Sequence, residues 1–328
     1  MAQNAPGKFY REGISLIEIM DLFPDDSTAE AWFAELRWPD GNVCCPHCGS
    51  LNVQTGAAHK MPYRCREKEC GRRRFSVRTG TVMDSSNLGF RTWALAIFLL
   101  LTSLKSVSSM KLHRDLKITQ KSAWHLAHRL RLALAEEGGL FSGPVEVDES
   151  YVGGQRHNMS KFKRRELSGA GRGSVGKTAV VGAKDRATNK VVAKVVEKTD
   201  RETLQGFIAD HTEPGATVYS DEASAYKGIP FNHETVKHSL AEYVRGVVHI
   251  NGIESLWAML KRAHKGTFHK LSPKHLNRYV QEFAAKHNLR EQDTIDIMGA
   301  VATGMRSKRL RYTDLIADNG LDSGARSV

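Results

Sequence analysis

The sequence predicts an α+β chain of several domains: a cysteine-bearing module, a helical region and an α/β domain. All five cysteines lie within residues 44–70, apolar residues at helical spacing dominate residues 88–134, and short apolar runs ending in carboxylates begin at Pro144. With 328 residues and 41% hydrophobic residues, the chain can form two domains with smaller modules attached.

The charge balance predicts a polyanionic partner. Lysine and arginine number 48 against 36 acidic residues, a net charge of +12, which favours double-stranded DNA. An ordinary basic protein is the alternative. The most apolar segment, Trp93–Leu101, is too short for a bilayer, which takes ~20 residues, and no secretory signal is evident. We therefore expect a cytoplasmic protein with no membrane partner.

Residues 1–40 predict an N-terminal segment of two short helices. Ser27 and Thr28 can cap the second helix, Ala29–Arg37, and Trp38-Pro39-Asp40-Gly41 ends it.

Residues 41–84 predict a zinc ribbon. A tetrahedral zinc ion takes four ligands from two tight turns, and two cysteine pairs supply them. Cys44 could replace Cys45, although Cys45 has the tighter C-x-x-C spacing, and the second pair encloses four residues, a wider loop. One structural zinc ion is therefore expected, in a reducing compartment. Its predicted ligands are Cys45, Cys48, Cys65 and Cys70.

Three arginines, Arg72, Arg73 and Arg74, follow the last of these cysteines. They could contact DNA phosphates, and a solvated basic face is the alternative.

Residues 85–137 predict a helix-turn-helix-like DNA-binding region. Helices are expected over Phe90–Leu101 and Val107–Leu116, and a third, capped by Thr119, through Leu134. A short helix, a turn and a basic-faced helix resemble a motif whose last helix enters the major groove, although a plain helical bundle is possible. The predicted DNA contacts on the third helix are Lys121, Ser122, His125 and Arg129.

Residues 143–290 predict an α/β domain, followed by a C-terminal tail over 291–328. Three strands, a helix, a further strand and a carboxylate-bearing helix form the layout of a ribonuclease H-like domain. A glycine-rich basic segment, 153–176, is expected to be a surface loop. The expected elements are strands Pro144–Asp148, Thr178–Ala183, Val191–Val196 and Thr217–Ser220, helix Thr203–Asp210, and further helices after Ile250.

Three carboxylates at particular positions in this domain predict its chemistry. Asp148 and Asp221 end strands, and Glu254 lies on the later helix. Such acids can converge on two divalent cations, magnesium or manganese, a site suited to in-line attack on a phosphodiester. Because alternate strand residues face opposite ways, we prefer the aspartates to the neighbouring Glu149 and Glu222.

The helix bearing Glu254 is expected to be two-faced. At 100° per residue, Asn251, Glu254, Ala258 and Lys261 share one narrow arc beside an apolar arc. Lys261 is therefore predicted to contact phosphate near the carboxylate, although a surface helix with a wet side would show the same pattern.

The segment Gly171–Thr178 matches the phosphate-loop pattern G-x-x-x-x-G-K-T. That motif requires a strand before it and a helix after it, whereas here a strand is expected to follow. We expect no nucleotide binding, and a basic loop that can touch DNA.

Several motifs in combination resemble the ISXO-type transposases of bacterial insertion sequences. The matching segments are Cys45-Pro46-His47-Cys48-Gly49, Phe75-Ser76-Val77-Arg78-Thr79-Gly80-Thr81, Val147-Asp148-Glu149-Ser150-Tyr151-Val152-Gly153-Gly154, Tyr219-Ser220-Asp221 and His249-Ile250-Asn251-Gly252-Ile253-Glu254 with Leu260-Lys261-Arg262.

The resemblance implies a DDE transposase that frees 3′ hydroxyls at element ends and joins them to target DNA, at least as a dimer. Asp148 and Asp221 would be the first two metal ligands. The family has Asn or Glu as the third residue with a downstream Lys, and this chain offers both Asn251 and Glu254. We favour Glu254, because a carboxylate binds a hard cation better than an amide. A transposase-derived DNA-binding protein without cleavage activity is the alternative.

Overall fold

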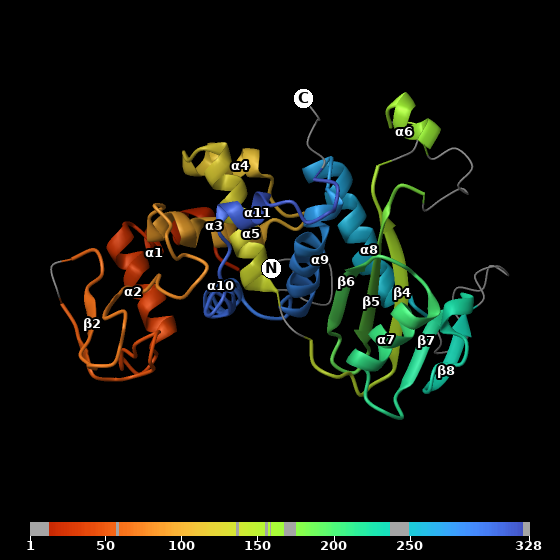
Figure 1. Cartoon of the computed structure of the whole chain (residues 1–328), viewed down its shortest axis with the longest axis horizontal. Helices are drawn as coiled ribbons and strands as arrows, with labels where there is room; N and C mark the ends of the chain where they lie inside the picture. The colour runs from red at the N-terminus through yellow and green to blue at the C-terminus, as the bar shows by residue number, and fades with distance from the viewer. Residues whose placement is uncertain are drawn as a thin grey trace, which may run out of the picture. The chain divides into compact units, whose positions relative to one another are not determined.

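The computed structural model describes residues 13–56, 59–135, 138–154, 157, 159–166, 175–236 and 249–323. The chain divides into two compact units (Figure 1). The first comprises residues 1–134 and 291–317, and the second comprises residues 135–290 and 318–328. Among the residues described, no helix combines the length and the apolar character needed to cross a membrane.

The first unit begins with two helices and a small antiparallel sheet of order β1-β2-β3. Aromatic rings form the core of the sheet: Tyr63 stacks on Phe75 with centroids 5.5 Å apart and meets Trp38 edge-on at 5.1 Å. These elements are α1 (Leu16–Leu22), α2 (Asp26–Arg37), β1 (Val53–Gln54), β2 (Tyr63–Cys65) and β3 (Arg74–Phe75).

Helix α2 begins three residues earlier than expected, so its cap differs from the predicted Ser27 and Thr28. The cap is Asp25, whose Oδ1 accepts a hydrogen bond from the Thr28 amide at 2.8 Å.

A helical region follows, with the predicted helix, turn and helix. Thr119 caps α5 as expected, because its Oγ1 accepts the Ser122 amide at 3.1 Å. Lys117 adopts a left-handed conformation (φ 51°) in the turn before it. The helices are α3 (Phe90–Thr102), α4 (Ser109–Leu116) and α5 (Gln120–Leu134).

Most of the predicted C-terminal tail folds into the first unit. Helices α10 (Thr294–Gly304) and α11 (Tyr312–Ile316) lie in this segment. Just after α10 in the sequence, the Met305 carbonyl accepts a hydrogen bond from the Val82 amide at 3.0 Å, and the Ser307 amide donates to the Gly80 carbonyl at 2.9 Å. The expectation of a tail was wrong for residues 291–317, because the partners that hold this segment, such as Gly80 and Val82, lie far away in the sequence.

The second unit contains a five-stranded sheet of order β6-β5-β4-β7-β8. Strands β4, β5 and β6 pair antiparallel, while β7 and β8 run parallel to β4. This order and these directions are those of the expected ribonuclease H-like fold; β8 had not been predicted. The strands are β4 (Val145–Val152), β5 (Thr178–Asp185), β6 (Val191–Val196), β7 (Thr217–Asp221) and β8 (Asn232–Val236).

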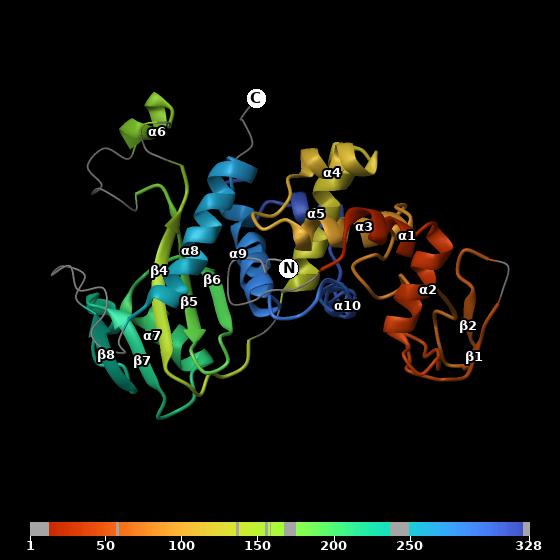
Figure 2. The same cartoon turned by 180° about the vertical axis from the view of Figure 1, so that it is seen from behind.

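Helices cover both faces of this sheet (Figures 1 and 2). Helix α7 packs Phe207 against Val147 on one face, and on the other α8 and α9 pack Trp257 and Tyr279 with Val180. These helices are α7 (Arg201–His211), α8 (Asn251–Ala263), which continues into a π-helical turn η4 (His264–Phe268), and α9 (Pro273–Asn288).

The expected basic loop contains a short helix, α6 (Lys161–Glu166), which the sequence had not indicated. Much of the remaining loop, including Gly171–Ser174 of the phosphate-loop pattern, lies outside the described residues. Strand β5 begins at Thr178, so a strand follows the pattern as expected. A short 3₁₀ turn, η2 (Ser224–Tyr226), follows β7.

Candidate active site and zinc centre

The two predicted aspartates lie at equivalent positions on adjacent parallel strands. In the β4–β7 register, Glu146 pairs with Tyr219. Asp148 and Asp221 each lie two residues further on, so they share one face of the sheet. Both are half-buried.

The surroundings of Asp148 contain like charges. Burial, followed by the charges of Glu149 and Asp221, raises the pKa of Asp148 from 3.8 to about 8. Two or three crowded carboxylates of this kind are the donors that a divalent cation prefers, since the cation removes the repulsion. The donor set therefore fits magnesium or manganese.

Glu149 also influences the aspartates electrostatically, although strand alternation places its side chain on the opposite face of the sheet. The hydroxyl group of the buried Tyr226, in η2, donates a hydrogen bond to Glu149 Oε2. Burial raises the pKa of Glu149, and the charge of Asp221 adds to this rise while the Tyr226 hydrogen bond opposes it. The long glutamate side chain therefore comes within electrostatic range of the aspartates from the other face.

Helix α8 has the two faces that the sequence predicted. Asn251, Glu254, Ala258 and Lys261 are exposed, whereas Ile253, Leu256, Trp257 and Leu260 are buried. From the buried face, the Trp257 indole Nε1 donates to Asp148 Oδ2 at 3.0 Å. The apolar face therefore contacts the first aspartate directly.

The structure does not gather the three predicted magnesium ligands into one tight cluster. In the described part of the chain, four cysteines form the one group of three or more Cys, His, Asp or Glu side chains whose ligand atoms all lie within 4.8 Å of each other. Glu254 and Asn251 lie exposed in the first turn of α8, so the choice between them stays a prediction.

The cysteine cluster contains the four predicted zinc ligands, Cys45, Cys48, Cys65 and Cys70. Sulfur atoms approach to 3.8 Å between Cys45 and Cys70 and to 3.6 Å between Cys48 and Cys65. Cys44 is outside the cluster. Four thiols at these separations fit a tetrahedral zinc ion, and the wider second loop does not prevent their convergence.

The predicted DNA-contact residues differ in their accessibility. Arg72, Arg73 and Arg74 are exposed beside the ribbon sheet, and Lys121 is exposed with its ammonium 4.3 Å from the centre of the Tyr312 ring. These side chains can reach phosphate.

The other contacts predicted on α5 are engaged within the first unit. Arg129 is buried, and its guanidinium donates to the carbonyls of Leu310 (3.0 Å) and Asp84 (3.2 Å). His125 Nε2 lies 3.0 Å from the same Leu310 oxygen, and Ser122 hydrogen-bonds with Thr119 at the helix start. The structure thus differs from the prediction at Arg129, whose charge holds the C-terminal segment in place.

The fold is that of a ribonuclease H-like domain of the DDE type, preceded by a zinc ribbon. Residues 140–288 match the ISXO2-like transposase domain, and residues 24–73 match the transposase zinc-ribbon domain. The two matches confirm the resemblance to ISXO-type transposases in both the catalytic domain and the zinc ribbon.

A relative from Halobacterium salinarum, described as an uncharacterized protein in transposable element ISH50, is 28% identical over 280 residues. The alignment spans 81% of this chain and 92% of that protein. A chain of a simian T-cell lymphotropic virus intasome structure aligns at 14% identity over 58% of this chain and 65% of its own length. Its TM-score is 0.27.

Proposed function

We propose that the protein is an active DNA transposase that frees 3′ hydroxyls at the ends of its element and joins them to target DNA. The observation that carries the proposal is the placement of Asp148 and Asp221 at equivalent positions on adjacent parallel strands, where the charge of Asp221 helps to raise the pKa of Asp148. Such a pair is unfavourable unless a cation is bound, which argues for a working metal site.

Asp148 and Asp221 would hold two magnesium or manganese ions together with Glu254, and Asn251 would complete the ligand shell or orient a phosphate. The ions would activate the attacking hydroxyl or water and stabilise the leaving oxygen. Trp257 holds the Asp148 carboxylate in one orientation through its indole N–H. Lys261, on the same exposed face as Glu254, would contact a phosphate near the carboxylates.

The basic surfaces would bind the element ends. Arg72, Arg73, Arg74 and Lys121 are exposed and suit phosphate contacts, which would supply most of the affinity. The zinc ion would fold the ribbon that presents the three arginines. Because transposition acts on two element ends, we infer at least a dimer on DNA.

The test is a cleavage and joining assay on DNA that carries the terminal repeats flanking the gene, with magnesium or manganese. Asp148→Ala should abolish both steps. Glu254→Gln should lower the rate by 10²-fold or more, in the order of magnitude typical of a lost electrostatic contact in an active site, while Asn251→Ala should lower it less.

Each outcome has a clear meaning. If Asn251→Ala is the inactive variant, the amide is the third catalytic residue. If the native protein binds the ends but never cuts them with either metal, the chain is a transposase-derived DNA-binding protein and the proposal fails.

A further inference from the structure

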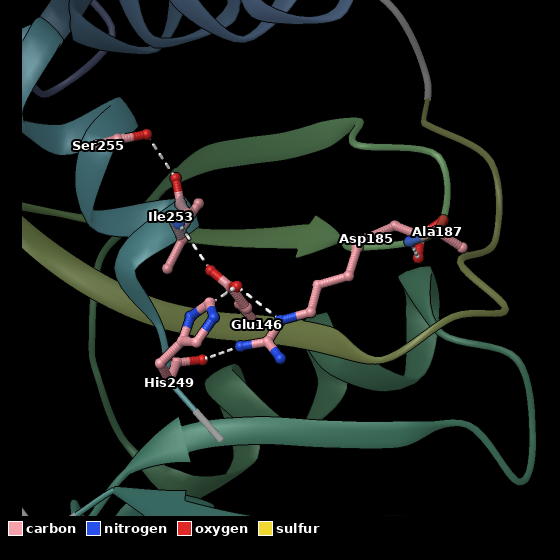
Figure 3. A network of polar contacts seen from close by, with 8 residues as sticks. Glu146, Asp185, Ala187, His249, Ile253 and Ser255 are labelled. Atoms are coloured by element: carbon pink, nitrogen blue, oxygen red, sulfur yellow. Dashed lines mark hydrogen bonds and ion pairs between the residues drawn. The ribbon is translucent and has the colours of Figure 1, made fainter. Parts of the chain in front are cut away.

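Glu146 is a buried acid in the same strand as Asp148, and it accepts hydrogen bonds from Arg186 and from the Ile253 amide. Its side chain lies on the same face of β4 as that of Asp148, two residues earlier, and the residue is 1% exposed. Glu146 Oε1 lies 2.7 Å from Arg186 Nε and 3.4 Å from His249 Nδ1. Its Oε2 accepts the Ile253 amide of α8 at 3.0 Å (Figure 3).

The bond to Ile253 replaces a cap that α8 lacks. The N-cap residue of α8, Ile250, provides no side-chain hydrogen bond. The first amides of a helix need acceptors, and negative charge is favourable there. A carboxylate from the sheet therefore holds the start of the helix that carries Asn251 and Glu254.

Arg186 ties the segment that enters α8 to the same point. Besides its bond to Glu146, its guanidinium donates to the His249 carbonyl and lies 4.5 Å from the centre of the Tyr219 ring. Its own amide donates to the Pro144 carbonyl at 3.0 Å, just before β4. The turn after β5, the start of β4 and residue 249 are thus joined through one residue.

The close approach of α8 to β4 depends on Gly252. A Cβ atom at this position would lie 2.6 Å from Glu146 Oε2 and 2.6 Å from Lys184 Nζ. A larger residue would force the Glu146 carboxylate, the Lys184 side chain or the helix itself to shift.

Helix α8 is fixed to β4 at two points that match in spacing. Ile253 bonds to Glu146 and Trp257 bonds to Asp148, so helix positions four apart meet strand positions two apart. Four helical residues rise about 6 Å, and two strand residues span about 6.6 Å. The two contacts fix different points along the helix and add to the apolar packing of Leu256 and Trp257 on the sheet.

From this geometry we infer that Glu146, held by Arg186, is a positioning residue that sets the register of α8 against β4 and so places Asn251 and Glu254 relative to Asp148. The catalytic consequence rests on the proposed function, whereas the positional consequence does not.

The position of the helix can be read from Trp257 in the full-length, zinc-loaded protein without magnesium. The chain has five tryptophans, and 5-fluorotryptophan labelling with Trp257→Phe identifies its ¹⁹F resonance. Glu146→Gln, which keeps an acceptor but loses the charge, should shift or broaden this resonance and leave the other four unchanged.

Asp185→Asn is the matched control. Asp185 is equally buried, at 1% exposed, and ends β5, but it accepts hydrogen bonds from its own turn at Ala187 and Thr188. This variant should leave the Trp257 resonance in place. If Glu146→Gln fails to fold, Arg186→Lys tests the same contact, because a lysine cannot bond to Glu146 and the His249 carbonyl in the same geometry.

In the cleavage assay at saturating DNA, Glu146→Gln should lower the rate on the order of 10²-fold, as expected for a small misplacement of reacting groups, with DNA affinity unchanged. Asp185→Asn should lose activity only in proportion to its folded fraction. An unmoved Trp257 resonance, or equal losses of activity in the two variants, would overturn the inference. If the native protein does not cleave, the proposed function fails, and the ¹⁹F measurement still decides the positional claim.

Discussion

Replacing Asp148 by asparagine should stabilise the metal-free protein, although the change removes a proposed catalytic residue. The carboxylate is half-buried beside Glu149 and Asp221, and these surroundings raise its pKa to about 8. An asparagine oxygen can still accept the hydrogen bond from Trp257 but brings no charge. The variant therefore removes repulsion while keeping the packing.

The sign of the effect follows from proton linkage. The unfolded chain releases this proton near pH 3.8 and the folded metal-free protein releases it near pH 8, so native stability falls as pH rises through this window. At about 1.4 kcal/mol per pKa unit, the ionised Asp148 can destabilise the folded metal-free protein by at most about 6 kcal/mol. Charges in real proteins are screened more strongly than such a value assumes. We therefore expect Asp148→Asn to raise the free energy of unfolding by about 2 kcal/mol at pH 9. This corresponds to a rise in Tm of roughly 4–8 °C for a unit of this size.

The assay is scanning calorimetry of the full-length protein. The buffer contains no magnesium and no chelator, so that zinc stays bound. The Asp148→Asn variant should melt higher than the native protein at pH 9 and at nearly the same temperature at pH 4. Magnesium at one hundred times its Kd should reverse the order at pH 9, because it should stabilise the native protein by about 2.7 kcal/mol and leave the variant unchanged. Asp185→Asn, the control, should be destabilised at both pH values. A lower Tm for Asp148→Asn without metal at pH 9 would refute the reasoning.

Three further predictions concern the zinc centre, α8 and the basic surface. Cys45→Ser should lose the bound zinc, measured by plasma mass spectrometry, and unfold the ribbon, whereas Cys44→Ser should keep one zinc per chain; equal zinc loss in both would contradict the ligand assignment. Gly252→Ala should lower the free energy of unfolding by about 1–3 kcal/mol in denaturant titrations, since its methyl group would overlap Glu146; an unchanged stability would show that the helix can shift freely. Replacing all three arginines of 72–74 by glutamine should reduce the slope of log K for DNA against log salt concentration by up to ~3, and an unchanged slope would remove them from the interface.

The parts of the fold that local pattern determines could be predicted from sequence. Thr119 caps α5 where expected, β6 has the expected bounds Val191–Val196, and the exposed and buried faces of α8 follow helical periodicity. In each case the signal lies within one element, because capping and periodicity depend on neighbours a few residues apart.

The parts that depend on distant partners could not be predicted. Arg129 has the spacing of a surface contact on α5, but the Leu310 carbonyl that binds it lies in a segment expected to be a tail. Glu149 was set aside by alternation, since nothing local shows that Tyr226 binds it near the aspartates. Long side chains and distant segments can thus override a correct local assignment.

The two acids on one face of β4 show how neighbouring charges distinguish a structural carboxylate from one that is proposed to bind metal. Glu146 is the more buried of the two and has Arg186 as a counter-ion within 2.7 Å. Asp148 has an indole N–H as its side-chain partner, and the charges that shift its pKa are carboxylates. A buried carboxylate with a cation contributes to the fold when its remaining oxygen is also bonded, as it is here by the Ile253 amide. A carboxylate that faces other carboxylates is unfavourable until a cation arrives from solution. The same strand thus supplies both the support for α8 and the first ligand of the proposed metal site, and removal of either acid should impair cleavage with opposite effects on the stability of the metal-free protein.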